Sequence, residues 1–274
     1  MTKKTTVIKA NSDARFNLQE ILSYHELFSF FALRDIKLRY RHITIAIIWA
    51  TIPPLTMSLV FNFTLGKVIQ TSPPHVPYIL FAYLGLIFWN YFSSIIYRSS
   101  NSLISNQALI TKIYFPRIIL PISSSTVSLV DFFFSLVLFC IILLYYQLPL
   151  NLTYLAIVIP NLVITFLFAS GLGVGFAALN VKYKDIRDLL PLLTSLLFFL
   201  TPVIYPVKLV SDFYYPLLYF NPMMGVIDTS RTSLFEPSYI NWHGLSVSFI
   251  SALIIFCSGA LYFKKTESEI IDRL

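Results

Sequence analysis

Residues 33–55 read LRDIKLRYRHITIAIIWATIPPL, a stretch in which a cluster of cations leads directly into a long apolar run. Four Lys and Arg side chains lie between Arg34 and Arg41, whereas no charged side chain occurs from there to Lys67. Lys and Arg gather at the cytoplasmic ends of membrane helices, and the hydrocarbon core excludes them. The stretch therefore predicts the point at which a first transmembrane helix enters the membrane from the cytoplasm.

The composition also indicates a membrane protein. Of the 274 residues, 57% are hydrophobic and 12% are charged, against about 25% charged in soluble domains. The net charge of +7 fits the cytoplasmic bias of Lys and Arg rather than nucleic-acid binding. Cys140 and Cys257 lie in apolar runs and are interpreted as small hydrophobic residues. Residues 1–42 lack the apolar core of a secretory signal.

Apolar runs long enough to cross a bilayer occur six times, since a helix needs about 20 residues for this. The chain is thus predicted to be an all-α membrane protein. Residues 1–42 would form a cytoplasmic segment, 43–263 the transmembrane domain and 264–274 a cytoplasmic tail. The predicted spans are 43–66, 78–97, 118–146, 152–181, 189–207 and 244–263.

The distribution of cations predicts the topology. With both termini in the cytoplasm, 17 of the 20 Lys and Arg residues fall on the cytoplasmic side. The other side holds only Lys67, Lys208 and Arg231. The positive-inside rule therefore favours a multi-pass protein of the cytoplasmic (inner) membrane with both termini inside.

Segments outside the spans are expected to form two further features. Leu18, Ile21, Leu22, Phe28 and Ala32 share one helical face, which predicts an N-terminal amphipathic helix in the interface; a stop-transfer anchor is the alternative. Segments 98–117 and 182–188 are either solvated turns or, with that helix, a docking surface for a second protein. The outer loop 208–243 is apolar enough to predict short re-entrant helices between spans five and six.

Few residues offer chemistry. No G-x-x-x-x-G-K-[ST] sequence is present, the four histidines lack metal-ligand spacing, and GLGVG at 171–175 favours close helix packing over nucleotide binding. Asp131 is the one acid deep in a span, with no partner apparent in the other spans. It is either a functional site or a structural acid satisfied by a nearby hydroxyl, such as those of SSSTVS at 123–128. We expect no catalytic group, metal or cofactor on this chain.

Aromatic and proline residues suggest a path through the membrane. Most of the 45 Phe, Tyr and Trp residues are expected to face lipid or the interfaces. The prolines of spans one and five predict helices that bend. Mid-span aromatics are candidates for lining a channel that suits sugars better than ions; these are Trp49, Trp89, Tyr91, Phe92, Phe198 and Phe199.

Four stretches in register resemble the permease subunits of ABC-2-type polysaccharide exporters, which export O-antigen, capsule and teichoic acid. The resemblance covers Leu33–Lys265, but Ala46 and Thr232-Ser233 depart from the pattern of that family. The stretches are residues 33–55, TKIYFPRIILPISSSTVSLVDF (111–132), LNVKYKDIRDLLPLLTSLLFFLTPVIYP (179–206) and FNPMMGVIDTSRTSLF (220–235).

The resemblance implies a homodimer that binds two copies of a cytoplasmic ABC ATPase, with ATP and Mg held by the ATPase. The cargo would be a lipid-linked polysaccharide, entering near Lys37, Arg39 and Arg41. Residues expected to dock the ATPase are Glu26, Arg34, Asn106, Lys112, Lys182, Lys184, Asp185 and Arg187. Alternatives are an ABC-2 permease for small lipids or drugs, a membrane-embedded cell-envelope enzyme, and a passive channel.

Overall fold

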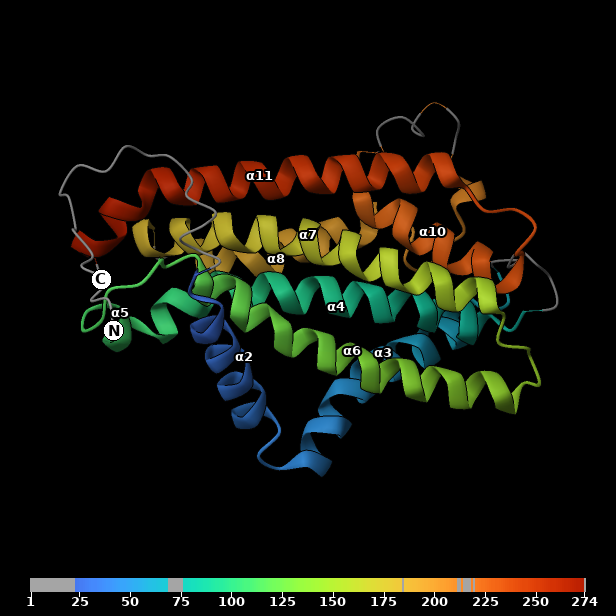
Figure 1. Ribbon diagram of the computed structural model, residues 1–274. Coiled ribbons are helices and arrows are strands. Elements are labelled where there is room, and N and C mark those ends of the chain that lie inside the picture. The colour runs from blue at the N-terminus through green and yellow to red at the C-terminus, as the bar shows by residue number, and fades with distance from the viewer. Residues whose placement is uncertain are drawn as a thin grey trace.

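The computed structural model describes residues 23–68, 76–183, 185–210, 213, 218 and 220–273, and every regular element in these ranges is helical. Figure 1 shows the helices as an elongated bundle. The elements are α2 (His25–Arg39), α3 (Ile43–Leu65), α4 (Tyr78–Ser105), α5 (Gln107–Ile110), α6 (Ile119–Tyr145), α7 (Leu152–Lys182), α8 (Ile186–Leu200), the 3₁₀ turn η1 (Val207–Leu209), α10 (Pro222–Phe235) and α11 (Trp242–Arg273).

Five of the described helices are long and apolar enough to cross a membrane: α3, α4, α6, α7 and α11. They coincide with five of the six predicted spans. The remaining span, 189–207, is not a continuous helix, because α8 ends at Leu200. Its 15 residues make a helix of about 22 Å, which is shorter than a hydrocarbon core of about 30 Å.

Helix α4 forms the centre of the bundle and is buried along most of its length. It packs against α7 on one side and α6 on the other, and α7 packs in turn against α11 (Figure 1). A Cβ added to Gly171 in α7 would lie 2.5 Å from the Phe256 Cα in α11. The close helix approach predicted from GLGVG is therefore confirmed.

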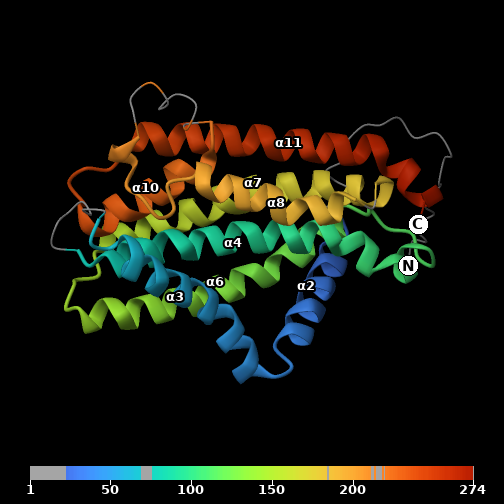
Figure 2. The same ribbon diagram turned by 180° about the vertical axis from the view of Figure 1, so that it is seen from behind.

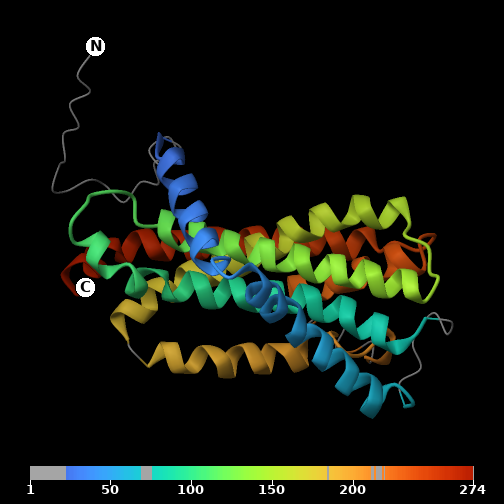
Figure 3. The ribbon, with the colours of Figure 1, turned by 90° about the horizontal axis from the view of Figure 1, so that it is seen from below.

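Helices α3 and α8 lie at the periphery of the bundle. Helix α3 contacts α4 and α6, while α8 has only small contacts with α4 and α7. Seen from behind, α8 runs along α4 and α7 (Figure 2), and seen from below it stands apart from α6 (Figure 3). Pro53 and Pro54 lie inside α3 without ending it, whereas Pro202 and Pro206 follow the end of α8.

One end of the bundle, which we call the basic end, brings together the ends of α4, α7 and α11 with α5 and the start of α6 (Figure 1). Its cations include Lys112, Arg117, Lys182, Arg187 and Lys264. Ion pairs and hydrogen bonds tie this end together: Lys182 Nζ lies 3.2 Å from a Glu269 carboxylate oxygen, and the backbone N–H of Arg117 donates to Glu267. Helix α10 and the end of α3 lie at the opposite end (Figure 1).

Candidate functional site

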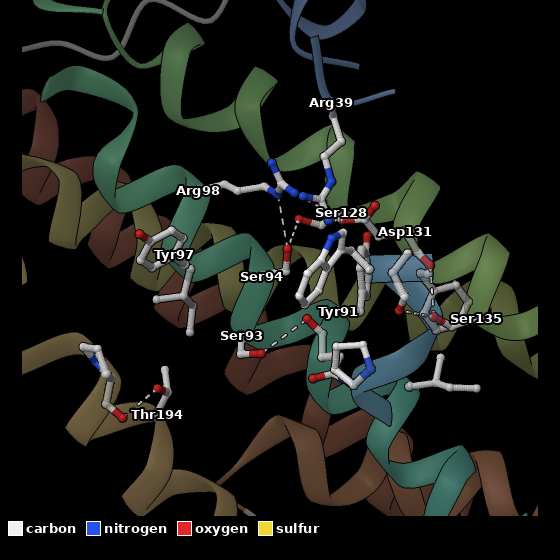
Figure 4. A pocket seen from close by; sticks show the side chains of 18 of the residues that line it. Arg39, Tyr91, Ser93, Ser94, Tyr97, Arg98, Ser128, Asp131, Ser135 and Thr194 are labelled. Carbon is white, nitrogen blue, oxygen red and sulfur yellow. Dashed lines mark hydrogen bonds and ion pairs between the residues drawn. The ribbon is translucent and has the colours of Figure 1, made fainter. Parts of the chain in front are cut away.

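A polar pocket opens between the peripheral helices and the centre of the bundle. It has a volume of about 370 Å³, and five helices contribute to its lining. Representative residues are Arg39 of α2, Trp49 of α3, Arg98 of α4, Asp131 of α6 and Thr194 of α8. Figure 4 shows Arg39, Arg98 and Asp131 converging on one side of the pocket and Thr194 on the other.

Asp131 has three close partners from other parts of the chain. The Tyr40 hydroxyl donates to Asp131 Oδ1 at 2.5 Å, and the Arg98 Nη2 donates to Oδ2 at 3.2 Å. The Arg39 Nη2 lies 3.7 Å from the same Oδ2. The expectation of an acid without partners in other spans was therefore wrong, and the hydroxyl that satisfies it belongs to Tyr40 rather than to the serines at 123–128.

The Tyr40 hydroxyl is a permanent donor in this arrangement. Burial and the hydrogen bond to Asp131 raise the pKa of Tyr40, which follows α2 and precedes α3. A tyrosine hydroxyl is protonated at neutral pH in any case, and the raised pKa extends the protonated range to higher pH, so that the hydroxyl can donate to Oδ1 of Asp131 throughout.

The pocket carries one uncompensated positive charge, since two guanidinium groups face a single carboxylate. The Arg98 Nε donates to the Ser94 hydroxyl at 3.2 Å, and the Ser94 and Ser128 hydroxyls lie 2.9 Å apart (Figure 4). The Arg39 Nε is buried and has no hydrogen-bond partner among the described residues. The excess positive charge and the unpaired Arg39 N–H favour an anionic ligand.

The pocket follows the first part of α3, from Arg39 before the helix to Pro53 inside it. The 23 residues of α3 span about 34 Å, close to the thickness of a hydrocarbon core of about 30 Å. In a membrane that α3 crosses from end to end, Ile43 would mark one boundary of the core, and Tyr40 would lie just beyond it. Asp131 contacts Tyr40 and would lie near this boundary, whereas Ala50 and Pro53 extend the pocket about 10–15 Å further along α3. Helices α4, α7 and α11, at 28, 31 and 32 residues, continue past this boundary.

The six candidate channel aromatics lie in different environments. Trp49 and Phe199 are 62% and 67% exposed on the single chain, and Tyr91 lines the polar pocket. Phe92 is buried and stacks on Phe168 in the core. Trp89 is buried with its ring edge against the partly buried Phe198. Trp49, Phe199 and Tyr91 are thus the candidates with surface facing outward or into the pocket.

Residues expected near the cytoplasm are likewise distributed. Arg39 enters the pocket, whereas Lys37 and Arg41 are exposed beside it. The Arg34 guanidinium pairs with Asp35 and donates to the Asn106 side chain at 2.9 Å, which joins α2 to the end of α4. Four other docking candidates are exposed: Glu26, Lys112, Asp185 and Arg187. Lys182 pairs with Glu269. Lys184 lies outside the described residues, as do Leu18, Ile21 and Leu22 of the expected amphipathic face.

A second polar centre, which the sequence reading missed, surrounds Arg231 of α10. This guanidinium is buried and donates to the Pro202 carbonyl at 2.8 Å, to the Phe81 carbonyl at 3.1 and 3.2 Å, and to the Val203 carbonyl. It also lies 3.6 Å from the centroid of the Phe81 ring. Arg231 therefore satisfies the backbone of the non-helical stretch after α8. The sequence feature that could have revealed this polar centre is Arg231 itself, the single cation within the apolar sequence 220–235.

A bundle of membrane-length helices with paired charged side chains in a pocket between the helices is typical of membrane transport proteins. The ABC-2 type transporter family matches residues 26–235, more than half of the chain, and the chain therefore belongs to that family.

Curated relatives cover nearly the whole chain. It is 26% identical over 245 residues to an O-antigen export system permease protein RfbA of Klebsiella pneumoniae, which covers 88% of this chain and 92% of that protein. It is 26% identical over 255 residues to RfbA of Myxococcus xanthus, with 91% and 96% coverage. A polysialic acid transport protein KpsM of Escherichia coli is 25% identical over 247 residues, with 86% and 92% coverage.

Proposed function

We propose that this chain is the membrane subunit of an ATP-driven exporter that moves a lipid-linked polysaccharide across the cytoplasmic membrane. The observation that carries this proposal is the similarity, over 86–91% of the chain, to proteins named for the export of O-antigen and the transport of polysialic acid. The family membership supports it independently, since the match to ABC-2 type transporters covers residues 26–235.

The topology we propose has six spans, with α8 as the fifth. Helix α8 is short, but the turn after it continues toward α10 and is held by Arg231, and irregular backbone is tolerated at membrane depth where protein satisfies it. The basic end of the bundle then faces the cytoplasm with both termini, in accordance with the positive-inside rule. In this orientation α2 lies in the inner interface and α10 enters the outer leaflet.

Two copies of the chain would form the translocation path. Large apolar side chains of α3 and α8 are exposed on the single chain, among them Trp49, Phe63, Leu196 and Phe199. Burying these faces against a second copy would bring the aromatic residues of both chains to one central path. ATP would be hydrolysed by a separate ATPase on the basic end, because this chain has no phosphate-binding loop sequence.

Purification of the tagged chain from native membranes tests this proposal. We expect mass spectrometry to identify an ATPase carrying G-x-x-x-x-G-K-[ST], and native mass to give two copies of each subunit. Arg187→Glu, at the basic end, should weaken this co-purification, whereas Lys67→Glu, at the opposite end, should leave it intact. Deleting the chain should abolish polysaccharide at the cell surface; unchanged surface polysaccharide and a chain that always purifies alone would refute the proposal.

A further inference from the structure

We propose that the polar pocket binds the phosphate group of a membrane lipid, and that Asp131 occupies the two guanidinium groups until that phosphate replaces it. This inference rests on the proposed function in one respect, since the lipid would be the carrier end of the exported polymer. The binding site itself is argued from the geometry of Arg39, Arg98 and Asp131.

The donors in the pocket match a phosphate better than a carboxylate. Arg39 and Arg98 both point to Oδ2 of Asp131, at 3.7 and 3.2 Å, so that one oxygen serves two guanidinium groups. The buried Arg39 Nε has no partner among the described residues. A phosphate presents three or more oxygens and can accept paired N–H bonds from both arginines at once.

Asp131 can release the arginines without losing every contact. Its other oxygen, Oδ1, accepts from Tyr40 at 2.5 Å, and this bond does not involve either guanidinium. When a phosphate takes the place of Oδ2, the carboxylate stays attached to Tyr40. Before a ligand arrives, Asp131 keeps two arginines from facing a membrane region without a counter-charge, which would be costly.

The position of the pocket favours a lipid over a soluble anion. In the topology proposed above, the pocket opens at the level of the headgroups and continues inward, because its lining runs from Arg39, before α3, to Pro53 inside that helix. Phe61 of α3 stacks on Phe198 of α8, with ring centroids 6.2 Å apart. From this contact the two helices diverge toward the basic end (Figure 3), and Trp49 and Thr194 border the pocket between them. A lipid could therefore place its phosphate at Arg98 and its chains in the opening between α3 and α8, against Pro53 and Pro191, rather than on the faces proposed to meet a second copy.

Native mass spectrometry of the full-length chain in phosphatidylcholine nanodiscs, titrated with phosphatidic acid, tests this inference. We expect one phosphatidic acid per chain to bind tightly. Losing a charge-assisted hydrogen-bond pair should make Arg98→Gln bind about tenfold more weakly, and Arg39→Gln should weaken binding in the same direction. Lys265→Gln, which removes an exposed cation of α11 outside the pocket, should leave binding unchanged.

The Asp131→Asn variant tests whether the Asp131 carboxylate competes with phosphate for the two arginines or has only a structural role. If the carboxylate competes with phosphate, this variant should bind phosphatidic acid several-fold more tightly. Weaker binding by a variant with an unchanged melting temperature would overturn the inference, as would equal binding by Arg98→Gln and the original chain. If Arg98→Gln does not fold, Arg98→Lys is the substitute test, because it keeps the charge but loses the paired donors. We expect this variant to bind phosphatidic acid with intermediate affinity, and full affinity would count against the site.

Inorganic pyrophosphate, added as a competitor, distinguishes a lipid from a free anion. We expect it to displace phosphatidic acid only at concentrations far above those of the lipid. Displacement at equal concentration would show a site for soluble anions and overturn the assignment to lipid. None of these measurements requires transport, so the two proposals can fail separately. If deletion of the chain leaves surface polysaccharide unchanged while the purified chain still binds phosphatidic acid, the proposed function is refuted and the binding site is retained.

Discussion

Replacing Gly171 by Ala should weaken the packing of α7 against α11, the most extensive helix contact in the described part of the chain. The added Cβ would lie 2.5 Å from the Phe256 Cα, whereas ordinary Cβ contacts begin at 3.4 Å. The backbone of α11 must therefore move by about 0.9 Å, and a gap of 0.5–1 Å forfeits about a quarter to a half of each local dispersion contact. Overpacked cores typically lose about 1–3 kcal/mol, and we expect a value near the upper end, about 2–3 kcal/mol, because the atoms that the added Cβ would meet belong to the backbone of α11.

Thermal unfolding of the purified chain in detergent, followed by tryptophan fluorescence, measures this effect. At about 2–4 °C for each kcal/mol, the Gly171→Ala variant should melt roughly 5–10 °C below the original chain. Gly175→Ala is the matched control, because its Cβ would meet only the Gly259 Cα, at 3.8 Å. Equal melting temperatures for the two variants would show that α7 and α11 do not approach as closely as described.

Three further substitutions probe the polar contacts by the same melting assay. Arg231→Met should leave several buried carbonyls without donors and cost about 3–5 kcal/mol, whereas Lys67→Met, at an exposed cation of the same end, should cost almost nothing; similar melting temperatures would contradict the role of Arg231. Asn161→Leu removes bonds from α7 to Val226 and Ser230 in α10 and should cost about 1–2 kcal/mol, so an unchanged melting temperature would count against this link. Tyr40→Phe should cost about 1 kcal/mol alone but little in an Asp131→Ala background, which removes the acceptor oxygen, and additive losses would show that the two residues act separately.

The sequence predicted the long helices well because the hydrocarbon core excludes charge over a fixed length. The limits of α3, α6 and α7 agree with the expected spans within about two residues. Helix α4 continues eight residues past the expected end at position 97, since Ser99, Ser100 and Ser102 are buried against protein rather than exposed to lipid. A prediction based only on which residues contact lipid therefore misses these eight residues of α4.

The partners of Asp131 could not be predicted from local sequence. Tyr40 is separated from Asp131 by 91 residues and reaches it only because the chain reverses between α2 and α3. The direction of that turn depends on tertiary packing, and no periodic pattern encodes it. The broken fifth span was partly predictable, because Pro202 and Pro206 indicated a bend, but the residue that stabilises the break lies in a later segment.

The separation of Val203 and Arg231 along the sequence has a consequence for biosynthesis. Arg231 is 28 residues further along the chain than the carbonyl to which it donates. In the proposed six-span topology, the stretch after α8 therefore enters the membrane during synthesis before its donor exists, and each bare carbonyl in lipid costs several kcal/mol. Completion of α10 satisfies these groups in one step. A nascent chain halted before this point would display an unsatisfied turn to membrane chaperones and proteases, which could thereby distinguish unfinished chains from finished ones.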